Sequence, residues 1–320
     1  MRYRPFGGTG WDVSEVGYGM WGMAGWTGSD DQQSRESLDL AVARGCNFFD
    51  TAWAYGDGHS ERLLGELVRR HPDTPIYVAT KIPPKNRRWP ARAEYALDDA
   101  FPPDHIREFA ETSLHNLGVD AIDLLQFHVW NDVWADDPAW QRAVDALVTE
   151  GLVRAVGISV NRWEPANVLR ALDTGLIQAV QVVYNIFDQS PEDELFPACI
   201  EKNIAVIARV PFDEGSLTGT LTATSSWPEG DFRNIYFKGS LAETLERVDR
   251  LRPLVPAGMM MPELALRHIL EHAAVSTVIP GMRKRAHVEQ NLAVSDGAPL
   301  PAELLGAIQQ HRWERTASRE

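Results

Sequence analysis

The sequence predicts an α/β protein built as a closed (β/α)8 barrel (a TIM barrel), because strand-like and helix-like segments alternate along 320 residues. The strand-like runs are dense in apolar residues rather than alternating, as strands covered on both faces should be. The length is ample for one such barrel, and we expect a single domain over residues 1–320. The expected barrel strands are residues 16–20, 47–50, 76–82, 121–130, 153–160, 179–185, 204–210 and 275–280.

Helix-period segments separate these runs. Residues 62–70 carry Leu63, Leu64 and Leu67 on one face. Gly118 follows residues 104–117 at the position where a left-handed residue ends a helix. Helical periodicity also predicts residues 140–149, 165–172 and 193–202.

Two segments fall outside the repeating units. Residues 2–15 contain a GGTG turn between two short extended runs, which predicts a β-hairpin ahead of the first barrel strand. Residues 211–240, after the seventh strand, form a long stretch rich in Gly, Ser, Thr and aromatic residues. A loop of that length in a compact domain is usually functional, such as a lid or clamp.

Charge and composition exclude several classes of protein. The formal net charge is −14, which argues against nucleic-acid binding and against tight binding to an anionic membrane. No apolar stretch approaches the length of a membrane span, and the first residues lack the apolar region of a signal peptide. Cys46 and Cys199 are isolated among apolar neighbours and predict buried thiols rather than a disulfide or metal site. We expect a cytoplasmic protein.

Polar residues at the ends of three successive strands are the candidates for chemistry, because barrel active sites lie at the carboxyl ends of the strands. Asp50 ends the second run, Lys81 the third and His128 the fourth, and Tyr55 lies in the loop after Asp50. A neighbouring ammonium group favours the phenolate and lowers the pKa of a tyrosine from its ordinary value of about 10. Each residue alone also suits a cap, a core or a surface position, so their convergence carries the prediction.

These residues lie within motifs that resemble those of the aldo-keto reductase superfamily, in order along the chain: FFDTAWAYGDGHSERLLGE, VATKI, NLGVDAIDLLQFH, LVRAVGIS, VQVVYNIFD and VIPGMRKRAHVEQN. The resemblance implies a (β/α)8 barrel that binds a nicotinamide cofactor, usually NADPH, without a Rossmann motif. It implies reversible, metal-free reduction of aldehydes and ketones to alcohols. By position, Tyr55 resembles the general acid, Lys81 and Asp50 the pair that tunes it, and His128 the histidine that orients the carbonyl.

The resemblance also predicts where the cofactor binds. Ser159 resembles the serine that bonds the nicotinamide carboxamide, with Gln181 beside it. Arg209 stands where many relatives have an aromatic ring that stacks on the nicotinamide, so its charge could alter redox bias or recruit an acidic group of the substrate. The predicted cofactor-binding residues are Trp21, Asp50, Ser159, Gln181, Arg209, Val210, Pro211, Phe212, Asp213, Gly215, Leu217, Gly281, Arg283, His287, Gln290 and Asn291.

Three cationic residues, Arg283, Lys284 and Arg285, stand at the expected start of a helix in the motif GMRKRAHVEQN. A basic helix start opposes the helix dipole, which favours a bound phosphate over helix stability as its reason. A solvated charged face is the alternative. His287 occupies a place where relatives commonly have Gln or Arg, so NADPH is the expected cofactor and NADH stays open.

Tryptophans in the loops at the barrel mouth predict the substrate pocket. Such residues suit a flat or ring-shaped apolar substrate, including a sugar or a natural product, although any one of them could instead pack the loops together. The predicted substrate-binding residues are Trp21, Trp26, Trp53, Tyr55, His128 and Trp130.

The sequence therefore predicts an NAD(P)H-dependent oxidoreductase, a monomer or weak homo-oligomer, acting on a small carbonyl or alcohol. The alternative is a barrel of the channel β-subunit type, which holds a nicotinamide as a sensor with little turnover. A metal-dependent barrel hydrolase or isomerase is a weaker reading, because only Asp50 and His128 stand at strand ends as candidate ligands.

Overall fold

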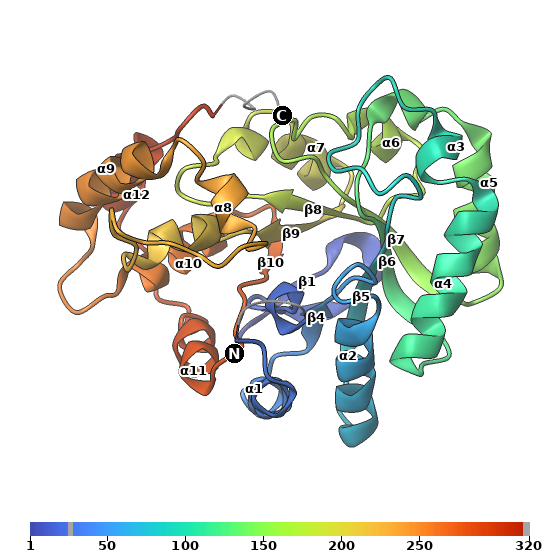
Figure 1. Cartoon of the computed structure of the whole chain (residues 1–320), viewed down its shortest axis with the longest axis horizontal. Coiled ribbons are helices and arrows are strands. Elements are labelled where there is room, and N and C mark those ends of the chain that lie inside the picture. Colours follow the sequence, from blue (N-terminus) through green and yellow to red (C-terminus); the bar gives the residue numbers. More distant parts are fainter. Residues whose placement is uncertain (25–27, 316–320) are drawn as a thin grey trace.

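A computed structural model describes residues 1–24 and 28–315 of the chain. Eight strands in the order of the sequence form one parallel sheet (Figure 1). The first and last of them are joined by parallel bridges, Val16 with Val278 and Gly19 with Gly281, so the sheet curls into a barrel. The predicted (β/α)8 barrel is thus confirmed. The barrel strands are β3 (Tyr18–Gly19), β4 (Phe48–Asp50), β5 (Tyr77–Ile82), β6 (Ile122–Phe127), β7 (Val153–Ser159), β8 (Ala179–Val183), β9 (Ala205–Arg209) and β10 (Val275–Val278).

Helices lie between successive strands and cover the outside of the barrel (Figure 1). They are α1 (Asp31–Ala43), α2 (His59–Arg70), α3 (Leu97–Ala100), α4 (Pro103–Leu117), α5 (Pro138–Thr149), α6 (Leu169–Asp173), α7 (Leu195–Glu201), α8 (Arg233–Tyr236), α9 (Leu241–Leu251), α10 (Met261–Glu271), α11 (Arg285–Ala293) and α12 (Ala302–Gln309). Gly118 ends α4 in the left-handed conformation with φ 65°, as expected.

The helix predicted over residues 165–172 is shorter than expected, because α6 begins only at Leu169. The side chain of Asn167 accepts a hydrogen bond from the backbone N–H of Asp132 at 2.8 Å. Its amide nitrogen also donates to Glu164 at 3.0 Å. Side-chain bonds of this kind hold the chain in turns and compete with helix formation.

The predicted hairpin pairs β1 (Tyr3–Pro5) with β2 (Asp12–Ser14) in antiparallel register. Phe6, just after β1, is fully buried inside the barrel beside Phe48, with their ring centroids 5.2 Å apart. Alanines from four strands lie in the same core layer and leave room for the two rings, namely Ala79, Ala155, Ala179 and Ala205. The hairpin therefore fills one end of the barrel interior, and the strands' carboxyl ends stay free for a site.

Glu61 is a fully buried carboxylate on α2. Its two oxygens accept hydrogen bonds from Thr80 on β5 at 2.6 Å and from Asn116 on α4 at 2.8 Å. Burial raises the pKa of Glu61, while these hydrogen bonds work to lower it. Glu61 thus ties two helices to a strand, as a fold residue rather than a catalyst.

The long segment after β9 holds the short helical turn η5 (Asp213–Thr218) and α8, and leads into α9. Leu217 of η5 is buried in an apolar cluster with residues of α9, α10 and α12, among them Val248, Leu264 and Ile308. Helices α9 and α12 lie at one end of the molecule in Figure 1 and anchor this segment to the barrel. Within the described residues, no helix is long and apolar enough to cross a membrane.

Candidate active site

Lys81 is the centre of the candidate site at the carboxyl ends of β4 and β5. It is 1% exposed, and its ammonium donates all three of its protons. The acceptors are Asp50 Oδ1 at 2.6 Å, the Thr51 carbonyl at 2.7 Å and the Tyr55 hydroxyl at 3.3 Å. Burial works to lower the pKa of Lys81, but the nearby Asp50 carboxylate holds it above its ordinary value. The lysine therefore stays charged in the interior and is fixed against Tyr55.

The second oxygen of Asp50 is held by two amides. Oδ2 accepts from Gln181 Nε2 at 2.7 Å and from Gln126 Nε2 at 3.0 Å. Asp50 is therefore bound on both oxygens and cannot turn away from Lys81. Gln181, which the sequence predicts to lie beside the nicotinamide, thus donates an amide N–H to this carboxylate.

Tyr55 lies on the turn between β4 and α2, so its hydroxyl reaches Lys81 across the strand ends. The sequence predicted a lowered pKa, and that prediction is wrong as a net effect. Burial raises the pKa of Tyr55 above its ordinary value, even though Lys81 and Arg209 both work to lower it. The phenol is therefore protonated at neutral pH and able to donate, and the two cations stabilise the phenolate that donation leaves.

His128, just after β6, faces Tyr55 with ring centroids 5.8 Å apart. Trp89 packs edge to face with the same imidazole, and the two ring centroids are 5.8 Å apart. Burial, followed by the charges of Lys81 and Arg209, holds the pKa of His128 well below its ordinary value. His128 is therefore neutral, and its buried Nδ1 has no hydrogen-bond partner among the described residues.

Arg209 ends β9 on the opposite side of the same mouth. One of its terminal nitrogens donates to the Val160 carbonyl at 3.0 Å. Its Nε is buried and has no hydrogen-bond partner among the residues that the structure describes. Burial lowers the pKa of Arg209, and Tyr55 and Asp50 are among the groups whose charges act on it.

The backbone after β9 is strained. Val210, Asp213 and Glu214 have positive φ angles of 56°, 48° and 53°, and Gly215 has φ 105°, where only glycine fits without strain. Strain of this kind clusters at ligand sites. Inside the turn, the backbone N–H groups of Asp213, Gly215 and Leu217 donate to the carbonyls of Val210 and Phe212, so the turn is closed on itself and is held next to Arg209.

A buried ion cluster holds this turn. Asp213 is fully buried, forms an ion pair with Arg315 at 2.7 Å and accepts a hydrogen bond from Ser216 at 2.6 Å. The Tyr236 hydroxyl also donates to Asp213, and Arg162 lies within ion-pair distance at 3.6 Å. Burial works to raise the pKa of Asp213, but Arg315 and Arg162 hold it below its ordinary value.

The arginines of this ion cluster have more donors than the protein satisfies. Nε of Arg162, and Nε and Nη2 of Arg315, are buried without partners among the described residues. With Nε of Arg209, the mouth thus carries several buried, unsatisfied guanidinium donors. Such donors fit a phosphate-bearing cofactor, because an anion bound there would satisfy them.

The other predicted cofactor positions lie at the carboxyl ends of β3, β7 and β10 or on α11. Ser159 ends β7 and pairs in register with Gln181. Arg283 is half-buried, and its side chain lies against Gly22, next to Trp21. Asn291 is 6% exposed, whereas Gly281, His287 and Gln290 are exposed. The residues at the strand ends thus share one rim of the barrel with the turn after β9.

The predicted substrate tryptophans divide into two kinds. Trp21 is 36% exposed and packs edge to face with Phe232. Trp53 is half-buried, and the guanidinium carbon of Arg87 lies 4.8 Å from the centroid of its ring. Trp130 is instead fully buried between Phe127 and Trp140, so the packing alternative describes it better than a substrate contact. Trp26 lies outside the described residues.

Several residues of the site were not predicted. Gln126 lies on β6 two residues before His128, and the polar residue in LLQFH was a usable signal. Trp89 has only its place in the loop after Lys81 as a signal. Arg162 and Arg315 have none, because Arg315 reaches Asp213 from the far end of the chain.

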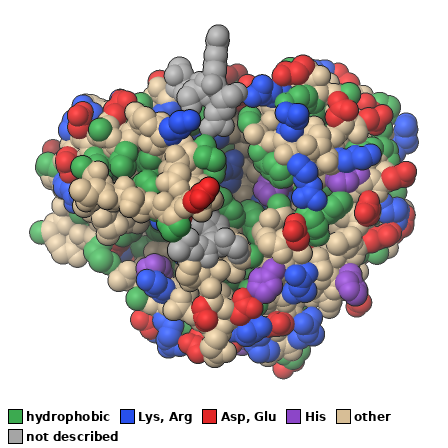
Figure 2. Space-filling view, viewed as in Figure 1, with side chains coloured by type: hydrophobic (Ala, Val, Ile, Leu, Met, Phe, Trp, Pro, Cys, Tyr) green, Lys and Arg blue, Asp and Glu red, His purple; other side chains and the backbone are tan. Residues whose placement is uncertain are grey.

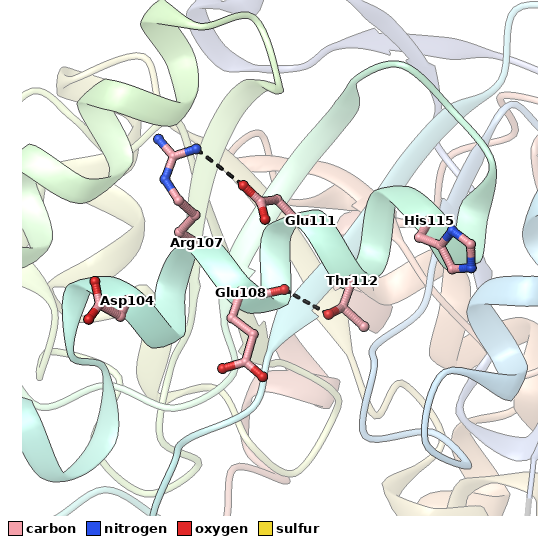
Figure 3. A pocket seen from close by; sticks show the side chains of 6 residues that line it. All are labelled: Asp104, Arg107, Glu108, Glu111, Thr112 and His115. Atoms are coloured by element: carbon pink, nitrogen blue, oxygen red, sulfur yellow. Dashed lines mark hydrogen bonds and ion pairs between the residues drawn. The ribbon is translucent and has the colours of Figure 1, made fainter.

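Figure 2 shows a hollow near the middle of this face of the molecule, with hydrophobic side chains around its edge. A second depression lies on the exposed side of α4, as Figure 3 shows. Its side chains are occupied locally, with Arg107 paired to Glu111 at 3.3 Å and Thr112 bonded to the Glu108 carbonyl. It has no group in common with the strand-end site, so it is a charged helix surface rather than a second candidate.

Comparison with known proteins agrees with this geometry. The model of the aldo/keto reductase family matches residues 15–312. The NADH-specific methylglyoxal reductase of Escherichia coli is 28% identical over 92% of this chain and 93% of the relative, and an uncharacterized oxidoreductase of Bacillus subtilis is 30% identical over 97% and 96%.

Solved structures superpose over the whole chain. A Bacillus halodurans aldo-keto reductase in its holo form has a TM-score of 0.79 at 27% identity, covering 100% of this chain and 99% of that one. The Gluconobacter oxydans glycerol dehydrogenase has a TM-score of 0.81 at 26% identity, covering 99% and 98%. The match over residues 15–312, the barrel and the strand-end cluster lead to one conclusion: this chain belongs to the aldo/keto reductase family.

Proposed function

We propose that this protein reduces an aldehyde or ketone to an alcohol, reversibly, with NAD(P)H as the hydride donor. The observation that carries the proposal is the Lys81 ammonium, which lies between Asp50 at 2.6 Å and the Tyr55 hydroxyl at 3.3 Å. That arrangement makes Tyr55 a proton donor whose conjugate base is stabilised in place. The bound cofactor would supply the hydride to the carbonyl carbon.

The protein's own groups divide the rest of the work. Tyr55 donates its proton to the oxygen that becomes the alkoxide, and Lys81 stabilises the resulting phenolate. His128 is neutral, so it can orient the carbonyl oxygen by a hydrogen bond without placing a third cation beside Lys81 and Arg209. Asp50, held by Gln126 and Gln181, keeps Lys81 in position.

The cofactor's phosphates would be held by the turn after β9 and by the cations near it. The residues proposed for this are those predicted from the sequence, with Arg162 and Arg315 added because of their unsatisfied donors. NADPH is the proposed form, since Arg283, Lys284 and Arg285 gather at the start of α11 in an acidic protein. NADH is the alternative. Both forms occur in the names of relatives, since one relative is named NADH-specific and another carries NADP(+) in its name.

The substrate would enter beside Tyr55 and His128. Trp21, Trp53 and Trp89 offer partly exposed aromatic faces near this entrance, which suits a small ring-bearing carbonyl such as a sugar or a natural product. Trp130 is left out of this pocket because it is buried.

The test is a fluorescence titration of the purified protein with NADPH and with NADH, read from the quenching of its eleven tryptophans. We expect saturable binding of at least one of the two, followed by its steady oxidation with members of a panel of aldehydes, ketones and aldoses. Failure of both cofactors to bind would overturn the proposal.

A second function has support from the comparisons. A probable voltage-gated potassium channel β subunit of Oryza sativa is 26% identical over 99% of this chain and 99% of the relative. A barrel of that type would retain the cofactor and show a single turnover at most. Sustained turnover with any carbonyl therefore separates the two functions. The cytoplasmic location and the monomeric or weakly oligomeric state stay predictions.

A further inference from the structure

The charges around Tyr55 do not cancel. Lys81 and Asp50 form a bonded pair and neutralise each other, and burial holds the pKa of His128 low enough to keep it neutral. Arg209 is the cation that remains. No carboxylate of the described residues lies within ion-pair distance of it.

Arg209 is close enough to the reacting groups to act on them. Its charge works to lower both the pKa of Tyr55 and that of His128. Outside the Tyr55 cluster, the acid whose charge acts on Arg209 is Glu214, and burial raises the pKa of Glu214 to about 7, so that carboxylate is only partly charged at neutral pH. The reaction centre therefore carries a net positive field.

A nicotinamide ring changes charge when it reacts, being neutral when reduced and cationic when oxidised. Any ring that delivers a hydride to a carbonyl bonded to Tyr55 must enter the mouth that Arg209 lines. The Arg209 guanidinium is held there by the Val160 carbonyl, with its Nε buried and unsatisfied, so it cannot swing into solvent without breaking that bond.

We propose that Arg209 is a specificity residue for the redox state of the cofactor, which makes the protein bind NAD(P)H in preference to NAD(P)+. This inference rests on the function proposed above. Two like charges several ångströms apart near a protein surface repel enough to lower affinity for the oxidised form by about tenfold to a hundredfold. Each tenfold difference raises the two-electron potential of the bound cofactor by about 30 mV.

The test measures dissociation constants of both redox forms, for the pair that the protein binds, by fluorescence quenching and calorimetry. We expect the wild type to bind the reduced form at least about tenfold more tightly. Arg209→Gln keeps a donor for the Val160 carbonyl but loses the charge. The ratio of the dissociation constant of the oxidised form to that of the reduced form should then fall about tenfold, because the oxidised form binds better. Arg209→Lys keeps the charge and should keep the preference.

Arg283→Gln is the matched control. Arg283 lies at the rim beside Gly22 rather than beside Tyr55, so its loss should weaken both forms by a similar factor and leave the ratio unchanged. Near-ultraviolet circular dichroism of each variant shows whether it is folded, and Arg209→Met, which also removes the charge, supplies the same comparison if Arg209→Gln is not.

The outcomes are distinct. If neither redox form binds the wild type, the proposed function fails. If both bind the wild type equally, or if Arg209→Gln leaves the ratio unchanged, the proposed function stands and the inference is overturned. Loss of turnover with carbonyls that carry a carboxylate, at an unchanged ratio and with neutral carbonyls unaffected, would instead make Arg209 an anchor for the substrate.

Discussion

The cluster around Lys81 and the cluster around Asp213 are both buried, but they are built differently. Lys81, Asp50 and their amide partners lie on barrel strands, and each of the three ammonium protons has an acceptor within the protein. Asp213 instead joins the turn after β9 to Arg162 and to the C-terminal Arg315, and both arginines keep buried N–H groups without partners among the described residues.

The hydrogen bonds of the Lys81 cluster are thus made within the protein, whereas the Asp213 cluster keeps donors that a bound ligand would satisfy. Satisfied buried polar networks rigidify a site, whereas unsatisfied buried donors are costly until an anion meets them. The proton-donating machinery is thus organised before anything binds. The turn after β9 is the part that we expect to tighten when a cofactor is present.

Tyr55→Phe is the most severe test of the complete cluster. The change removes one oxygen and leaves the ring and its packing, so cofactor affinity should be nearly unchanged. Carbonyl turnover should fall by about 10³-fold, within the range for loss of a positioned acid. Steady-state kinetics with a cofactor titration would check both, and near-normal turnover would remove Tyr55 from its proposed role.

Lys81→Met tests how far the cluster depends on charge pairing. It leaves the Asp50 carboxylate buried without its cation, which should cost about 3–5 kcal/mol of the free energy of unfolding. Urea denaturation measures this loss. The double variant Asp50→Asn/Lys81→Met removes both charges and should regain most of the stability without regaining turnover, and a double variant as unstable as the single one would contradict the pairing.

Arg315→Met tests the cluster that is left incomplete. Asp213 would keep Arg162 and Tyr236, so we expect a folded protein whose cofactor dissociation constant rises about tenfold, as expected for loss of one charged hydrogen bond to the anion or its turn. Arg312→Met is the control, because Arg312 belongs to the same tail but pairs with the exposed Asp193. Equal effects of the two variants would show that the tail acts without the cluster.

Glu214→Gln should produce the smallest effect, one that depends on pH. Burial raises the pKa of Glu214 to about 7, so between its unfolded value and pH 7 the folded state binds more protons than the unfolded state. Stability should therefore fall as pH rises through this window, and the variant should be more stable than the wild type at pH 8 by on the order of 1–2 kcal/mol, with no difference below pH 4.

Denaturation at several pH values measures this difference. Glu229→Gln, an exposed position in the same long segment, is the matched control and should leave the pH dependence unchanged. A constant gap between Glu214→Gln and the wild type at every pH would contradict a buried, titrating Glu214.

The barrel was predictable because dense apolar runs mark strands covered on both faces, and all eight predicted runs contain a barrel strand. Asp50, Lys81 and His128 were predictable for a related reason, since parallel strands bring their ends to one mouth. The length of α6 was not, because Asn167 engages Asp132 through a contact that periodicity does not record.

The rest of the site depends on contacts between segments far apart in the chain. Nothing near Arg315 in the sequence points to Asp213, and nothing in the segment around Trp130 says that its ring turns into the core. The net pKa of Tyr55 was also beyond the sequence, because a lysine next to it was foreseeable but the extent of burial was not. The direction in which a side chain points and the extent of its burial are known only from the folded structure.

The central claim is that Tyr55 supplies the proton for a carbonyl reduced by a nicotinamide hydride. The most direct test uses cofactor carrying deuterium at either C4 position, with mass spectrometry of the alcohol formed by the wild type and by Tyr55→Phe. We predict deuterium on the carbinol carbon from one of the two labelled forms, and alcohol formation slowed by about 10³-fold in the variant. Alcohol without deuterium from either form, or formed equally fast by the variant, would contradict the account.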